Sequence, residues 1–255
     1  MNVIRLFNQN ISIRFTTVAM VYVSLLLALL LFLLACSLLS GSYELSIQDV
    51  LYSLFQQSTA DKKVSLIIWE FRLPRSLVAM FSGALFAISG TLLQNMTRNP
   101  LADPSLVGIS HGAALAVVTL TVLFPTYIDA WREISAFLGA IFVTIIIQWL
   151  RGDGHPLKFI LLGIGVVAFI SAIISTLITY GEFQSAMTAL AWLSGSTHTT
   201  SWQDVEILAS ATLIFTGFAV YQSRVMLATS LGDDVAIGLG VPINRVMKIQ
   251  LSISV

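Results

Sequence analysis

Long apolar stretches, separated by short polar segments, dominate the pattern of this chain. A helix needs about 20 apolar residues to cross the ~30 Å hydrocarbon core of a membrane. Six stretches reach or approach that length, at residues 17–39, 73–93, 106–124, 133–150, 158–180 and 204–222. A seventh apolar run begins near Val246 and comprises only ten residues, 246–255. The pattern predicts an all-α integral membrane protein, a polytopic helical bundle with about six full spans and the start of a seventh, forming a single domain over residues 1–255.

Composition agrees with a membrane protein. Hydrophobic residues make up 56% of the chain and charged residues 10%, which is too apolar for a soluble domain of this length. Thirteen basic and thirteen acidic residues cancel, so nothing indicates a nucleic acid partner. The single cysteine, Cys36, ends the stretch LLAC, which has the form of a lipoprotein cleavage box. Because the surrounding apolar run is longer than a signal core of about 7–15 residues, we favour a first span over a removable signal.

Lysine and arginine positions orient the spans. If the N-terminus is cytoplasmic, the inner segments hold eight of these residues and the outer segments five. The excess of cations inside predicts this orientation. Four of the outer five lie within residues 62–75, so this cluster opposes the general bias and needs a local reason.

Two of those cations, Arg72 and Arg75, stand at the mouth of the second predicted span. Pro74 lies between them, and we expect the helix to begin near this proline. A cation at a helix N-terminus is opposed by the helix dipole, so neither dipole nor bilayer explains Arg75. Two interpretations remain. In the first, both side chains snorkel to lipid phosphates. In the second, they form charge-assisted hydrogen bonds with carboxylates of a docking protein.

Residues for catalysis are missing from the apolar stretches. His111 stands alone on the stretch GISHGAALA, and we favour a neutral histidine within helix packing over a role on a substrate path. The chain has no HExxH, GxSxG or GxxxxGK[ST] motif. We therefore expect no catalytic residue, no metal site and no resident cofactor. Energy for any uphill transport would come from a partner.

The longest inner segment has the pattern of a contact with such a partner. Within residues 227–248, Leu231, Val235 and Leu239 form an apolar stripe, and Asp233 and Asp234 would lie in a first helical turn. Gly240 and Pro242 then predict a helix stop and a new helix start. Because membrane-surface helices are usually rich in Lys and Arg, we favour docking in a groove of a protein over docking on lipid.

Small residues recur every four positions in several stretches, which favours close helix packing in lipid. The three sets are Gly83, Ala87 and Thr91; Gly108 and Gly112; and Ala136, Ala140 and Thr144.

Four motifs, taken in order, resemble a known family. FRLPR (71–75), GALFAISGTLLQ (83–94), NPLADPSLVGISHGAALA (99–116) and LGDDVAIGLGVP (231–242) are similar to the permease subunits of binding-protein-dependent ABC importers for ferric siderophores, haem and cobalamin. The resemblance implies a dimeric, all-helical permease of ten spans per subunit in the bacterial cytoplasmic membrane. It also implies an extracytoplasmic substrate-binding protein, separate ATPase subunits and a second permease subunit, identical or different.

The resemblance also implies roles for particular residues. Arg72 and Arg75 match arginines that pair with glutamates of the binding protein. His155 and Pro156 fall near the inner gate, although the local sequence differs there. The cytoplasmic coupling segment, residues 227–242, matches the helices that seat in the ATPase, through Leu231, Gly232, Asp233, Asp234, Val235, Ala236, Leu239, Gly240, Val241 and Pro242.

A ferric siderophore is the favoured cargo because that group is the commonest in the family. Cobalamin and haem stay open, since no residue on the path specifies the cargo. The alternative of another class is an ATP-independent channel or a structural membrane subunit. Family members exceed three hundred residues, so we expect spans eight to ten to be missing here, either from a fragment or from an interrupted, non-functional product.

Overall fold

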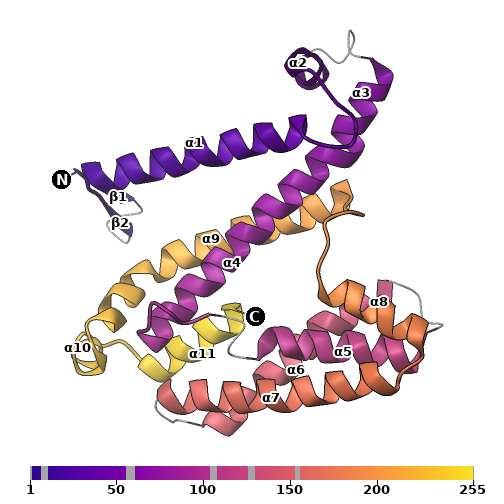
Figure 1. The fold of residues 1–255 in the computed structure, drawn as a ribbon. Coiled ribbons are helices and arrows are strands. Elements are labelled where there is room, and N and C mark those ends of the chain that lie inside the picture. Colours follow the sequence, from indigo (N-terminus) through magenta and orange to yellow (C-terminus); the bar gives the residue numbers. More distant parts are fainter. Residues whose placement is uncertain are drawn as a thin grey trace. The chain divides into compact units, whose positions relative to one another are not determined.

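The computed structural model describes residues 2–6, 11–55, 61–103, 108–125, 130–152 and 156–254. Within these ranges the regular secondary structure is helical apart from two short antiparallel strands, β1 (Asn2–Leu6) and β2 (Ile11–Phe15) (Figure 1). The predicted all-α fold class is therefore confirmed.

Five helices in the described part of the chain are long and apolar enough to cross a membrane. They are α1 (Thr17–Leu39), the continuous helix Lys62–Thr97, α6 (Ala130–Arg151), α7 (Pro156–Tyr180) and α9 (Trp202–Ser230). The continuous helix consists of α3 (Lys62–Leu66), a π-helical turn η1 (Ile67–Arg72) and α4 (Leu73–Thr97). The first, fourth and fifth predicted spans agree closely with these helices, the second begins earlier than predicted, and the sixth continues beyond its predicted end to Ser230.

The predicted third span forms a shorter helix, α5 (Ile109–Leu123), of 15 residues. It contacts α6, α7 and α8 (Phe183–Leu193), and it buries Gly112, Val117 and Val118. Because protein surrounds much of α5, its length need not match that of a lipid-exposed span.

The sequence prediction that a helix begins near Pro74 is wrong. The helix is continuous from Lys62, and the π-helical turn lies directly before the proline. There the Leu73 N–H donates to the Ile68 carbonyl, five residues earlier, in place of the usual four. A proline has no N–H and clashes with the carbonyl four residues before it in a regular helix. The wider turn gives the chain a different path at this point, so the helix passes through Pro74.

The chain packs as two compact units. The first comprises residues 1–83 and 197–213, and the second comprises residues 84–196 and 214–255. The first unit has a small core between the end of α1, α2 (Ile47–Phe55) and the α3–η1 segment, formed by Leu38, Val50, Val64 and Ile68.

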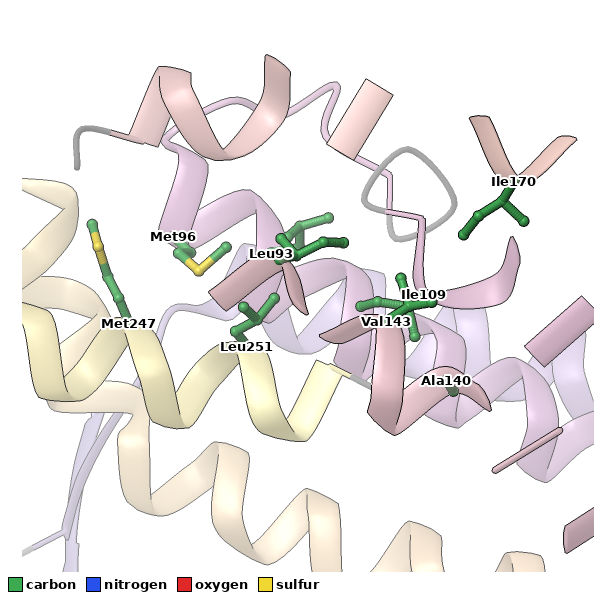
Figure 2. Packing of buried hydrophobic residues seen from close by; sticks show 9 residues of the cluster. Leu93, Met96, Ile109, Ala140, Val143, Ile170, Met247 and Leu251 are labelled. Carbon is green, nitrogen blue, oxygen red and sulfur yellow. The ribbon is translucent and has the colours of Figure 1, made fainter. Parts of the chain in front are cut away.

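The second unit has the larger core. Its buried cluster draws residues from α4, α5, α6, α7 and α11 (Ile243–Ser254), and Figure 2 shows eight of them labelled. The apolar run predicted from Val246 forms α11, in which Met247 and Leu251 face this cluster. The residues are Leu93, Met96, Ile109, Ala140, Val143, Ile147, Ile170, Met247 and Leu251.

Small residues bring α5 and α6 together. A Cβ added at Gly112 would lie 2.6 Å from the Gly139 carbonyl oxygen, and one added at Gly139 would meet the Gly112 carbonyl. The predicted pair Gly108 and Gly112 thus contributes Gly112 to a close helix contact. Its partner, Gly139, was not predicted from the sequence. A Cβ added at Gly83 on α4 would meet no atom within 4 Å.

Candidate functional site

Arg72, the first of the two arginines beside Pro74, is buried and bonds the backbone at and just beyond the end of another helix. Its side chain is 9% exposed. Nη1 donates to the Leu38 carbonyl at 2.7 Å and to the Leu39 carbonyl at 3.1 Å, and Nη2 donates to the Tyr43 carbonyl. The last carbonyls of a helix lack partners within the helix, and a cation there is favoured by the helix dipole. Arg72 therefore caps the C-terminal end of α1.

Gly41 fits against this cap. A Cβ at residue 41 would lie 2.5 Å from Arg72 Nη2 and 2.9 Å from Arg72 Cζ. A side chain at this position would displace the guanidinium from the carbonyls of α1.

Arg75 is different. Its side chain is half-buried, and Nη2 donates to the His198 carbonyl at 3.1 Å. Its Nε is buried and has no acceptor among the residues that the structure describes. The sequence grouped the two arginines, whereas the structure gives them unequal surroundings.

Two tryptophans fix the segments around Arg75. Trp202 Nε1 donates to the Trp69 carbonyl at 2.9 Å, and the two rings stack with centroids 6.0 Å apart. Trp69 Nε1 donates in turn to the Ser53 carbonyl at 3.1 Å. These bonds join α2, η1 and the start of α9. Sequence reasoning missed this contact, because nothing local pairs residues 133 positions apart.

The coupling segment forms a short helix with defined ends. Helix α10 (Asp233–Gly238) follows Gly232, and Leu239 closes it. Gly240 has φ +79°, and its N–H donates to the Ile237 carbonyl while the Val241 N–H donates to the Ala236 carbonyl. This is the arrangement in which a left-handed residue ends a helix. The predicted stop at Gly240 is confirmed, and α11 begins directly after Pro242.

An apolar face of this segment is exposed. Leu231, Val235 and Leu239 are 62%, 47% and 64% exposed, and Ile237 is also exposed. Ala236 is fully buried, so it anchors the helix to the rest of the protein. The predicted stripe therefore lies at the surface, where a partner could cover it.

The two residues expected at an inner gate are only partly described. His155 lies outside the described residues, and Pro156 is the first residue of α7. A cavity of about 550 Å³ opens elsewhere in the second unit. Its lining is formed by Phe86, Ala87, Gly90, Thr91, Gln94, Ala102, Asp103 and Ser110.

The chain is similar to permease proteins of transport systems. It is 33% identical over 247 residues to the achromobactin transport system permease protein of Dickeya dadantii, an alignment that covers 95% of this chain and 70% of that protein. It is 36% identical over 225 residues to an Fe(3+)-citrate import system permease protein of Bacillus subtilis, covering 87% of this chain and 66% of that one. The chain thus spans about two thirds of the length of these relatives.

A solved structure shares the fold. A metal-chelate type ABC transporter in an inward-facing conformation matches with a TM-score of 0.77 at 24% identity, over 90% of this chain and 70% of that one. The model of the FecCD transport family matches residues 29–255, which is nearly all of the sequence. The protein is therefore a multi-pass membrane protein that belongs to the FecCD transport family.

Proposed function

We propose that this chain is the transmembrane permease subunit of a binding-protein-dependent ABC importer that moves a ferric siderophore across the bacterial cytoplasmic membrane. The observation that carries the proposal is the similarity, over most of the chain, to permeases whose names specify achromobactin and ferric citrate. Membership of the FecCD transport family agrees with this role.

Separate ATPase subunits supply the energy in this proposal. The sequence has no GxxxxGK[ST] loop, so it lacks that means of binding ATP. The exposed apolar face of Leu231, Val235 and Leu239 is the surface that we assign to the ATPase. Buried Ala236 would hold α10 against the permease while the exposed apolar residues contact the moving partner.

The substrate-binding protein docks on the opposite side of the membrane. If α1, α4, α5, α6, α7 and α9 each cross once, the coupling segment returns to the side of the N-terminus, which we take as the cytoplasm. The Arg72–Arg75 end of α4 then lies outside. Of the two, Arg75 is the better candidate for a carboxylate of the binding protein, because Arg72 already bonds three carbonyls.

Two further elements complete the proposal. A second permease subunit, identical or different, would enclose the substrate path together with this chain and the surrounding lipid. His155 and Pro156, which lead into α7, are proposed as the inner gate.

Transport assays test the function and its alternatives. The permease gene, in its chromosomal reading frame, is expressed with the ATPase and binding protein in cells that lack their own iron importers. We expect ATP-dependent accumulation of ⁵⁵Fe from a ferric citrate, catecholate or hydroxamate complex, and no accumulation without the binding protein. Uptake of labelled cobalamin or haem would redirect the substrate class. Uptake that persists without the ATPase would indicate a channel and contradict the proposal.

A further inference from the structure

A second cationic cap lies at the inner end of α4. The helix ends at Thr97, and the Arg98 and Asn99 N–H groups donate back to the Asn95 and Gln94 carbonyls at 3.3 and 3.2 Å. Arg98 has φ +51°, in the left-handed region that favours glycine. An arginine at this position needs a reason beyond the helix stop.

Side chains from this turn bind the last turn of α9. Asn95 Nδ2 donates to the Met226 carbonyl at 2.9 Å. The Thr229 hydroxyl has three acceptors in reach for its single proton: Asn95 Oδ1 at 3.0 Å, the Met226 carbonyl at 3.0 Å and the Val225 carbonyl at 3.1 Å. Arg98 Nε donates to the Thr229 carbonyl at 3.0 Å. Thr229 itself is 7% exposed, so its hydroxyl and the amide it bonds are largely shielded from water. The cation again lies at a helix C-terminus, where the dipole favours it.

The same Thr229 carbonyl also accepts a hydrogen bond from the start of α10. The donor is the Gly232 N–H at 3.3 Å, and Gly232 is the residue from which α10 begins. Its φ of +116° lies in a region that a side-chain-bearing residue rarely adopts. One carbonyl thus joins Arg98 of the α4 end to Gly232, the residue that precedes α10.

We propose that Asn95, Arg98 and Thr229, here called the inner clasp, are positioning residues that hold α10 in register with α4 and so transmit movement of the coupling segment into the permease. This inference rests on the proposed function, because it takes α10 as the contact with the ATPase. The clasp explains why an arginine occupies the left-handed position: the side chain, and not the backbone, is needed there.

Glycine at residue 98 separates the two roles. Arg98→Gly keeps the left-handed helix stop, which glycine adopts more readily, and removes only the side chain of the clasp. Arg98→Lys keeps the charge. Arg245→Gln is the matched control, since Arg245 is an exposed cation on α11, on the cytoplasmic side in the proposed topology.

Coupling is measured on the complete complex of permease, ATPase and binding protein in nanodiscs. For Arg98→Gly we expect the stimulation of ATP hydrolysis by the binding protein to fall about threefold to tenfold, while the ATPase stays bound and the thermal midpoint does not fall. Arg98→Lys should recover part of the stimulation, and Arg245→Gln should match the wild type.

The clasp hydroxyl gives an independent test. Thr229→Val keeps the shape of the side chain and removes the hydroxyl within reach of Asn95, so it should reduce stimulation in the same way. Thr229→Ser keeps the hydroxyl and should restore it. A purely structural role would not separate these two variants in stimulation while leaving their thermal midpoints alike.

Hydrogen exchange on the permease alone distinguishes failure of this inference from failure of the proposed function. Amides of residues 231–239 should exchange about tenfold faster in Arg98→Gly, with no change in α6. Unchanged exchange would overturn the clasp, and faster exchange with unchanged stimulation would overturn its role in coupling. A wild-type complex that the binding protein does not stimulate would instead refute the proposed function, and the exchange result would still decide the clasp.

Discussion

Replacing Arg72 should destabilise the protein far more than replacing Arg75. Arg72→Met keeps an unbranched apolar stem and removes the donors to the carbonyls of Leu38, Leu39 and Tyr43. A hydrogen bond to a charged group contributes about 1.5–3 kcal/mol. The bond to Leu38 is buried and counts in full, whereas the other two are partly buried and count for about half, so we expect a loss of about 3–6 kcal/mol.

Arg75→Met is the matched control on the same turn. It removes one exposed hydrogen bond, to the His198 carbonyl, and should change stability by less than about 1 kcal/mol. The same variant should weaken capture of the binding protein about tenfold, and Arg75→Glu should do so more strongly. Capture by Arg75→Glu should recover in part when a glutamate of the binding protein is changed to arginine.

Tryptophan fluorescence offers a direct assay, because Trp69 and Trp202 stack within the same unit as Arg72. Unfolding of detergent-solubilised protein by denaturant, followed at these residues, gives the midpoint for each variant. Equal midpoints for Arg72→Met and the wild type would refute the capping role of Arg72. Unchanged capture by Arg75→Glu would refute the docking role of Arg75.

Gly41 supplies a double-mutant test of the same cap. Gly41→Ala should displace the guanidinium and cost about 1–3 kcal/mol, while Ser42→Ala, its exposed neighbour, should cost little. If both changes act through the guanidinium, Gly41→Ala should have little further effect in the Arg72→Met background. Additive losses would show that Gly41 acts in another way.

Three further predictions concern other parts of the chain. Leu239→Asp adds a charge to the exposed apolar stripe and should abolish co-purification of the ATPase in detergent, while membrane insertion stays normal. Gly112→Ala should cost about 1–3 kcal/mol in a thermal or denaturant unfolding assay, whereas Gly165→Ala, which meets nothing within 4 Å, should be neutral or stabilising. Hydrogen bonds from the side chain and backbone of Ser46 lower the pKa of Asp49, so their stabilisation of the start of α2 is complete above the ordinary aspartate value of about 4 and is lost as pH falls through the lowered pKa. Amide exchange at residues 46–50, corrected for its intrinsic pH dependence, should show this loss at low pH in the wild type and no such pH dependence in Asp49→Asn.

The length of the apolar runs was enough to predict α1, α6, α7 and α9, because lipid requires a long uninterrupted helix. The same rule gave a longer third span than α5, since it cannot show that a helix is enclosed by protein. It also missed α2 and α8, of 9 and 11 residues, which are too short to cross. The end of a helix can be predicted from sequence where a single residue determines it. Gly240 is such a residue, because its left-handed backbone needs no distant partner.

The candidate sites show the same limit. Charge alone singled out Arg72 and Arg75, because cations at the start of a span are uncommon. Which of them is buried depends on carbonyls about 30 positions earlier in the chain, and sequence spacing holds no information about those contacts. The inner clasp was missed for the same reason, since Arg98 and Thr229 lie 131 positions apart.

The two arginine caps suggest why a cation lies at residue 72, against the general bias of positive charge. Arg72 bonds the last carbonyls of α1, and Arg98 bonds a last-turn carbonyl of α9, so each arginine lies at the negative end of another helix's dipole. With the proposed cytoplasmic N-terminus, α1 ends on the outer side, and its C-terminal carbonyls need a cation there. Arg72 therefore opposes the positive-inside bias for a reason internal to the fold, and α1 rather than lipid phosphate satisfies its charge. No such reason holds for Arg75, which donates to the exposed His198 carbonyl and whose buried Nε lacks an acceptor among the described residues. Because the Arg75 side chain is only half-buried and donates to an exposed carbonyl, its guanidinium can meet a carboxylate from outside the chain, and the docking proposal therefore rests on Arg75.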